Sequence, residues 1–413
     1  MLLAVVVSSA LLVATPVRAQ QGDIRGIIAG PFIISPVIET DVEVDSNVLN
    51  APEAFGQDTG DASASVGFGI DVRMPFGNNL LEFDYNGANV EYDKSEFAGG
   101  LRQQAALGVR LKFRSSDRLR IRDSFLRDFS QILDSSIPDS GPGFEPEQKY
   151  FGSPYIFNRF DIDLERNESH RIGYRVQIGR RDFQYENGTV GTQFEFDGFD
   201  NTFEYFQPLS SGRKIVVHYS MRRLNNYRDG EGQFREEVSD AVEAGLIGVG
   251  GSRPLFFRVG YSRFLYKYPD GSSSNDDSDN FRGLSGFARW LLPFGGRSSL
   301  AMTVSRRPLP SSFDTFYVSS QFRGTAERAF RPRVRVALLG GVRQNRYANE
   351  IPQLTCDGLR QDWLWDAGFR ASWSPHHLIQ LRLAGAHEER TSNCQNVDYV
   401  STSVNLGINL GWF

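Results

Sequence analysis

Apolar and polar residues alternate along most of this chain. The clearest run is the last one, in which Val404, Leu406, Ile408 and Leu410 are separated by small or polar residues. Successive side chains of a strand point to opposite faces, so this pattern predicts a strand with one apolar and one polar face. The same period of two recurs from residue 34 onward, and no segment has the period of an amphipathic helix.

The repeated alternation predicts an all-β chain of about eighteen strands. Sixteen is the alternative count, because residues 191–206 break phase once, as a β-bulge would. The expected strands are 34–46, 62–74, 79–92, 101–113, 118–130, 154–165, 170–184, 191–206, 213–227, 236–249, 254–268, 281–293, 297–307, 313–324, 330–347, 361–373, 377–388 and 397–413.

The connections between these segments alternate in length. Every second one is short and turn-like, while the intervening ones are often longer and more polar. Short periplasmic turns alternating with longer external loops are typical of a closed antiparallel transmembrane β-barrel, and a soluble all-β protein, the alternative fold, has no reason to sort its loops in this way. The short connections lie near 75–78, 114–117, 166–169, 208–212, 250–253, 294–296 and 374–376, and the long ones include 131–153, 269–280, 348–360 and 389–396.

The N-terminal segment and the composition agree with a barrel exported to the bacterial outer membrane. Residues 1–19 contain an apolar run followed by small residues, which predicts a signal peptide cleaved before Gln20. Residues 20–31 then form a short periplasmic segment, too short for a plug domain, and residues 32–413 form the barrel. Outside the signal peptide, no run reaches the ~18 apolar residues of a membrane-spanning helix. Aromatic residues make up 13% of the chain, which suits the aromatic girdles of such a barrel.

Arginine dominates the cationic residues: the chain has 45 lysines and arginines, of which only five are lysine. Guanidinium groups pair with carboxylate and phosphate, so arginine suits both a charged pore wall and contact with outer-membrane lipid and lipopolysaccharide. The net charge of -5 gives no indication of a nucleic-acid partner, and none is expected.

The polar phase of the strands is unevenly charged. Carboxylates gather on the first three strands and arginines on later ones, which predicts a transverse electric field across the lumen. The alternative is that many of these groups pair with one another and hold the wall together. The expected pore-lining residues are Glu39, Asp41, Glu43, Asp71, Glu82, Asp84, Arg258, Arg289, Arg323, Arg333, Arg335, Arg343, Arg370 and Arg382.

Two features of the external loops suggest further constraints. The third loop is the longest and, by analogy with general porins, is a candidate constriction that would bring Asp134, Asp139, Glu145 and Glu147 into the lumen; an ordinary external loop is the alternative. Cys356 and Cys394 fall in neighbouring external loops, which predicts a disulfide in an exported protein, with two free thiols as the alternative.

The sequence gives little indication of enzymatic activity. His218 and Ser220 have the His-x-Ser spacing of outer-membrane esterases. In the strand alternation, however, both fall on the face that points into the lumen, whereas a lipid-cleaving site should face the lipid. The histidines show no clustered metal spacing with cysteines or carboxylates. We therefore expect no catalytic residues, no metal and no cofactor.

The first strand resembles that of a known family. Pro36-Val37-Ile38 and then Asp45-Ser46-Asn47-Val48 are similar to the opening of the β-barrel porins encoded beside exopolysaccharide and capsule genes. The resemblance implies a full-length barrel that is the outer-membrane exit for a secreted polysaccharide, working with a periplasmic export partner. Passive diffusion of small charged solutes is the alternative function, and a surface-structural or adhesive barrel is the third.

Overall fold

The computed structural model describes residues 26–47, 60–94, 99–114, 116–128, 155–166, 172–185, 196–210, 212–228, 234–250, 253–267, 280–310, 316–331, 333–348 and 355–411. This part of the chain consists of strands and turns, and it contains no helix that is long and apolar enough to cross a membrane. The strands are β1 (Ile27–Ala29), β2 (Phe32–Asp45), β3 (Asp61–Phe76), β4 (Asn79–Tyr92), β5 (Gly100–Lys112), β6 (Asp117–Asp128), β7 (Tyr155–Arg166), β8 (Gly173–Tyr185), β9 (Phe196–Ser210), β10 (Arg213–Arg228), β11 (Phe234–Gly250), β12 (Arg253–Lys267), β13 (Phe281–Phe294), β14 (Ser298–Pro310), β15 (Phe316–Arg331), β16 (Val334–Tyr347), β17 (Gln361–His376), β18 (Ile379–Ser392) and β19 (Tyr399–Gly411).

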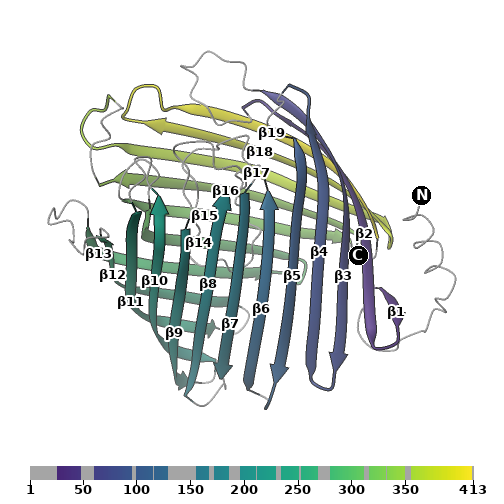
Figure 1. Cartoon of the computed structure of the whole chain (residues 1–413), viewed down its shortest axis with the longest axis horizontal. Coiled ribbons are helices and arrows are strands. Elements are labelled where there is room, and N and C mark those ends of the chain that lie inside the picture. The colour runs from purple at the N-terminus through teal and green to yellow at the C-terminus, as the bar shows by residue number, and fades with distance from the viewer. Residues whose placement is uncertain are drawn as a thin grey trace.

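Strands β2 to β19 form a closed antiparallel barrel (Figure 1). Each pairs with the strand before and after it, and β19 closes the ring on β2, from Gly411 opposite Val37 to Ser403 opposite Asp45. The short β1 pairs with β2 and is not one of the eighteen strands of the barrel ring. Each strand of the closed ring is therefore paired on both sides over at least part of its length, as a β-structure in lipid requires. The predicted fold is therefore confirmed, with eighteen strands in the ring rather than sixteen.

One face of the sheet is identified as the lumen by contacts that span several strands. Arg258 on β12 lies 3.2 Å from Glu204 on β9, across β10 and β11. Side chains of strands that far apart can meet only on the concave face. Residues directly opposite each other in an antiparallel pair have their side chains on the same face. The strand register therefore identifies the inward and outward residues of every strand in the ring.

The opposite face is apolar and exposed. On β19 it carries Val404, Leu406, Ile408 and Leu410, whose side chains are between 42% and 57% exposed. On β17 every outward residue from Trp363 to Trp373 is apolar. The segment from Trp363 to Trp373 spans about 33 Å along the strand, or about 25 Å along the barrel axis at the usual tilt. That length matches the hydrocarbon layer of an outer membrane, with exposed tryptophans at both ends.

Most strand boundaries agree with the sequence-based ones, but β9 and β15 differ. β9 was expected to end at residue 206, yet it continues to Ser210 and includes Pro208. The register with β10 shifts at Arg213 and Lys214, opposite Ser210 and Pro208, so the bulge lies at the end of β9. A proline, which has no N–H to donate, is tolerated at such a bulge. β15 extends to Arg331 instead of residue 324, because residues 325–328 pair with both neighbouring strands despite their weak alternation.

Several periplasmic connections are tighter than expected. β3 and β4 are joined at Gly77, which has a φ of 60°, a conformation that favours glycine. β17 runs through residues 374–376, predicted as a turn, and the chain reverses at residues 377–378. The predicted signal peptide at residues 1–19 lies outside the described residues, and β1 lies within the segment 20–31.

Candidate functional site in the barrel lumen

The acidic residues predicted to line the pore wall all lie on the inward face of adjacent strands β2, β3 and β4. Asp71 and Asp84 are directly opposite each other. Asp71 accepts a hydrogen bond from Arg73 at 2.9 Å, while Glu82 pairs with Arg110 at 2.5 Å. The inward residues of this acidic wall are Glu39, Asp41, Glu43, Asp71, Glu82 and Asp84.

The predicted arginines, with one exception, also lie on the inward face. The exception is Arg333, which precedes β16 and donates a hydrogen bond to the carbonyl oxygen of Pro375 at 2.8 Å, bracing two periplasmic turns. The inward ones are Arg258 on β12, Arg289 on β13, Arg323 on β15, Arg335 and Arg343 on β16, Arg370 on β17 and Arg382 on β18.

Acidic and basic walls meet at the closing strand. Arg382 of β18 reaches across β19 to Asp41 of β2, at 2.9 Å. Its path runs over Gly407, where an added Cβ would lie 2.2 Å from the carboxylate of Asp41. Gly407 leaves this path open, whereas a larger residue would require the Asp41 carboxylate to shift.

Three of the predicted inward arginines lack an ion-pair partner among the described residues. Arg289, Arg335 and Arg370 are exposed on the inward face, and no carboxylate of the described chain lies within 4 Å of their guanidinium groups. Arg323 is an intermediate case, 3.7 Å from Asp366. The inward wall therefore combines arginines held by carboxylates with arginines that remain available to an anion.

A second charged network lies on β7 to β12, and of its members the sequence analysis listed only Arg258 as pore-lining. Arg159 pairs with Asp161 at 2.7 Å, Arg181 pairs with Asp200, and Arg258 pairs with Glu243 at 2.6 Å as well as with Glu204. Charged residues at the polar positions of these strands could have predicted this network. They were overlooked because arginines and carboxylates alternate along these strands, so neither charge predominates.

His218 also belongs to this network. Its Nδ1 lies 3.1 Å from Glu204 Oε1, and its side chain is buried. Ser220 shares the inward face two residues along β10. The described part of the chain holds no group of three or more histidines, cysteines or carboxylates placed to bind a metal.

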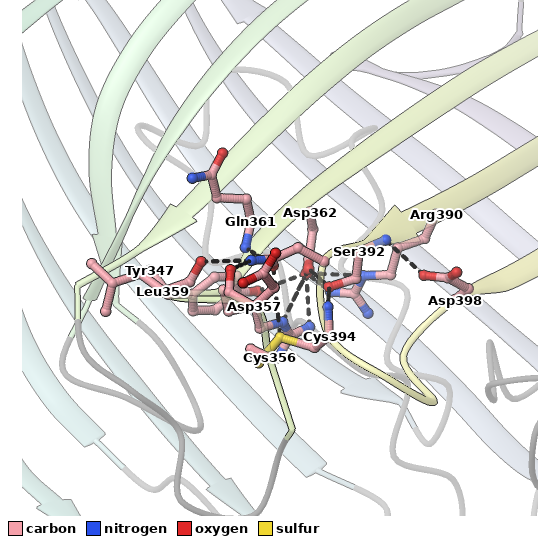
Figure 2. The surroundings of a disulfide bond; sticks show 12 residues. Tyr347, Cys356, Asp357, Leu359, Gln361, Asp362, Arg390, Ser392, Cys394 and Asp398 are labelled. Atoms are coloured by element: carbon pink, nitrogen blue, oxygen red, sulfur yellow. Dashed lines mark hydrogen bonds and ion pairs between the residues drawn. A yellow bond between two sulfur atoms is a disulfide. The ribbon is translucent and has the colours of Figure 1, made fainter.

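At the external rim, a disulfide joins Cys356 and Cys394 (Figure 2). The two cysteines form an isolated antiparallel bridge between the β16–β17 and β18–β19 connections. Asn393 ties the same connections together, since its side chain donates to the carbonyl oxygens of Asp357 and Leu359 and accepts from the Gln361 amide. This part of the rim is therefore cross-linked both covalently and by hydrogen bonds.

Beneath the disulfide, Asp362 is completely buried and fully paired. Arg360 donates to it at 2.7 Å and Arg390 lies 2.9 Å away, while the hydroxyls of Ser392 and Tyr347 donate at 2.7 Å and 3.2 Å. A buried carboxylate is tolerated when its charge and lone pairs are satisfied in this way. The candidate constriction residues Asp134, Asp139, Glu145 and Glu147 lie outside the described residues.

Comparison with known proteins gives a likeness of fold. No family model matches the chain, and no curated protein matches it. Among solved structures, it is similar to the outer membrane protein OpdK of Pseudomonas aeruginosa, with a TM-score of 0.52 and 12% identity over 92% of this chain and 99% of that one. OpdQ of the same organism gives a TM-score of 0.50 and 12% identity over 94% and 100% of the two chains.

A third similar structure is the apoprotein form of the FrpB iron transporter of Neisseria meningitidis, with a TM-score of 0.50 and 8% identity over 92% of this chain and 81% of that one. At such low identity the likeness concerns the fold alone. Closed barrels with an apolar exterior of this height span bacterial outer membranes. The chain is thus an integral outer-membrane β-barrel with a porin-like architecture.

Proposed function

We propose that this barrel is a passive-diffusion channel for small charged solutes. The observation that carries the proposal is the set of exposed inward arginines without carboxylate partners among the described residues, Arg289, Arg335 and Arg370. Arginines that are already paired with carboxylates bind a solute anion less readily, so the unpaired ones are the groups that a small charged solute would contact. Barrels of sixteen to eighteen strands are wide enough to contain an aqueous channel.

The mechanism we propose is selection of solutes by charge, in which no covalent bond is formed or broken. Arginines gather on β13 to β18 and carboxylates on β2 to β4, so a solute in the lumen would experience a field across its path. The guanidinium fork matches the geometry of carboxylate and phosphate groups. Small anions would then follow the arginine side of the wall, and cationic groups the acidic side.

Export of a polysaccharide, which the family resemblance implies, is the second candidate. A sugar pathway needs aromatic faces open to the lumen, and the sequence offers Tyr317 and Tyr399 at the inward phase. Their side chains are only 2% and 4% exposed, so neither offers a free ring face to a passing sugar. We therefore rank diffusion of small solutes first, and a periplasmic export partner belongs to the second candidate.

The proposal is tested with purified barrel in planar bilayers and liposomes. We expect stepwise conductance, and faster liposome swelling with small charged solutes than with neutral sugars of similar mass. In a deletion strain, uptake of such solutes should fall while surface glycan is unchanged. A correctly folded barrel without conductance would contradict the proposal, and a loss of surface glycan with normal solute uptake would favour the second candidate.

A further inference from the structure

The hydrogen-bonded ladder between β13 and β14 covers only part of these strands. It runs from Phe294 opposite Ser298 at the periplasmic turn to Gly286 opposite Arg306. Beyond that point, residues 281–285 pair only with β12, and residues 307–310 pair only with β15. The external part of the wall therefore has a seam between β13 and β14 that backbone hydrogen bonds do not close.

Aromatic contacts show where the strand ends beyond the seam lie. By register, Phe264 and Phe281 are on the inward face of β12 and β13, whereas Phe316 is on the outward face of β15. Nevertheless, the ring centroid of Phe316 lies 5.6 Å from that of Phe264 and 5.7 Å from that of Phe281. An outward side chain can meet inward side chains only if its strand lies on their lumen side. We call residues 307–310 and 316–319 the inner tip.

Burial agrees with this placement. Phe316, Tyr317, Val318 and Ser319 are consecutive, and all four are at most 8% exposed. Elsewhere outward residues of the same strand face lipid, as Phe322 does at 43% exposure. The inner tip is thus covered on its outward face by β12 and β13. Its inward face is covered in part by Tyr347, whose ring stacks on Tyr317 at 5.4 Å.

Arg307 is the charged residue that the inner tip presents inward. Arg307 lies opposite Ser319 in the ladder with β15, on the inward face, and its side chain is partly exposed. No carboxylate of the described residues lies within 4 Å of Arg307. The inner tip therefore presents to the lumen a guanidinium group that has no counter-charge among the described residues.

We propose that the inner tip narrows the lumen and that Arg307 on it forms a site for small oxyanions, meaning carboxylates or phosphates. The missing counter-charge is the recognition element, since a bound oxyanion would supply it and accept hydrogen bonds from the guanidinium fork. This inference rests on the proposed diffusion function and names its solute class and the residue that selects it.

The first experiment measures ion selectivity and block by inorganic phosphate in planar bilayers, comparing the wild type with Arg307→Gln and Arg307→Lys. Arg306→Gln is the matched control, because Arg306 is adjacent in sequence but faces outward, where it donates to Ser320 at 3.0 Å. We expect phosphate to reduce the chloride current of the wild type and of the control. In Arg307→Gln the half-blocking concentration should rise by about tenfold, as the loss of one charge-assisted contact implies, with a smaller rise in Arg307→Lys.

The outcomes separate the two proposals. If the wild type conducts and Arg307→Gln keeps the anion preference and phosphate block of the wild type, the oxyanion site is wrong and the channel function stands. If the correctly folded wild type does not conduct at all, the proposed function fails and this inference fails with it.

The position of the inner tip is tested by cross-linking. Cysteines replacing Phe281 and Phe316 should be joined by a short bifunctional thiol reagent in the folded barrel, as should cysteines replacing Phe264 and Val318. Cysteines replacing Phe281 and Phe322 should not, because Phe322 lies lower on β15 and faces lipid. Absence of both expected cross-links in barrels that migrate as folded would overturn the placement of the inner tip inside the wall.

Discussion

Arg382 and Asp41 are 341 residues apart in the chain and form an ion pair across the strand that closes the barrel. The pair connects β18 to β2 over the backbone of β19, at Gly407, where the intervening residue has no side chain. Barrel closure thus depends on both the ladder of backbone hydrogen bonds and a contact that the missing side chain of Gly407 permits.

Replacing Gly407 by leucine should destabilise the barrel. The new side chain would occupy the path of the guanidinium and leave Arg382 and Asp41 without each other, at a cost of about 1–3 kcal/mol. The measurement is urea unfolding of the barrel in detergent. Gly324→Leu is the control, because the nearest atom to a Cβ at Gly324 is 4.0 Å away. In an Arg382→Gln background, Gly407→Leu should cost less; equal costs in both backgrounds would rule out the coupling.

Asp362→Ala should loosen the external rim more than any other single carboxylate change there. The substitution leaves Arg360 and Arg390 buried without their shared partner, and loss of one member of a buried ionic group costs about 3–5 kcal/mol. Protease cleavage of residues 355–361 on intact cells measures the effect. Asp398→Ala is the control, because Asp398 is exposed and its carboxylate accepts a hydrogen bond from the Ser392 amide. Similar cleavage of both variants would show that the buried cluster does not hold the rim.

Arg370→Glu should shift the reversal potential of the channel toward cation selectivity. Arg370 is exposed on the inward face and lies near Arg335 on the adjacent strand, so reversing its charge changes the local potential without breaking an ion pair of the described residues. Recordings under a salt gradient measure the shift. Arg306→Glu, on the outward face, should leave the reversal potential unchanged; an equal shift in both variants would mean that the inward position of Arg370 has no special effect.

Much of the fold could be predicted from the sequence because alternation records the environment of every strand residue. Lipid on one side and charged side chains on the other impose a strict period of two, and loop lengths give the orientation. The inner tip could not be predicted, because residues 307–310 and 316–319 keep the same alternation whether their strands continue the barrel wall or lie on its lumen side. Likewise, the alternation of apolar and polar residues predicted that Arg382 and Asp41 face the lumen. Only the strand register shows that Gly407 lies between them.

The outward face near the external end carries arginines that we expect to bind the phosphates of lipopolysaccharide. Arg263 and Arg282 are directly opposite each other on β12 and β13. Like charges in this position repel, costing about 0.2–1 kcal/mol. Asp240 compensates Arg263 at 2.6 Å, while Arg282 is exposed and has no ion-pair partner among the described residues. A lipid phosphate at this height would supply the missing negative charge.

Arg282→Gln should therefore lower the amount of lipopolysaccharide that copurifies with the barrel, as measured by native mass spectrometry. The control is Arg328→Gln, an outward arginine near the periplasmic end of β15 that lies 5.0 Å from the ring of Phe330. Lipopolysaccharide occupies only the outer leaflet, so the control should retain as much of it as the wild type does. If Arg282→Gln retains as much glycolipid as the control, the outward arginines are not its binding site, and the opposed pair is compensated by some other group.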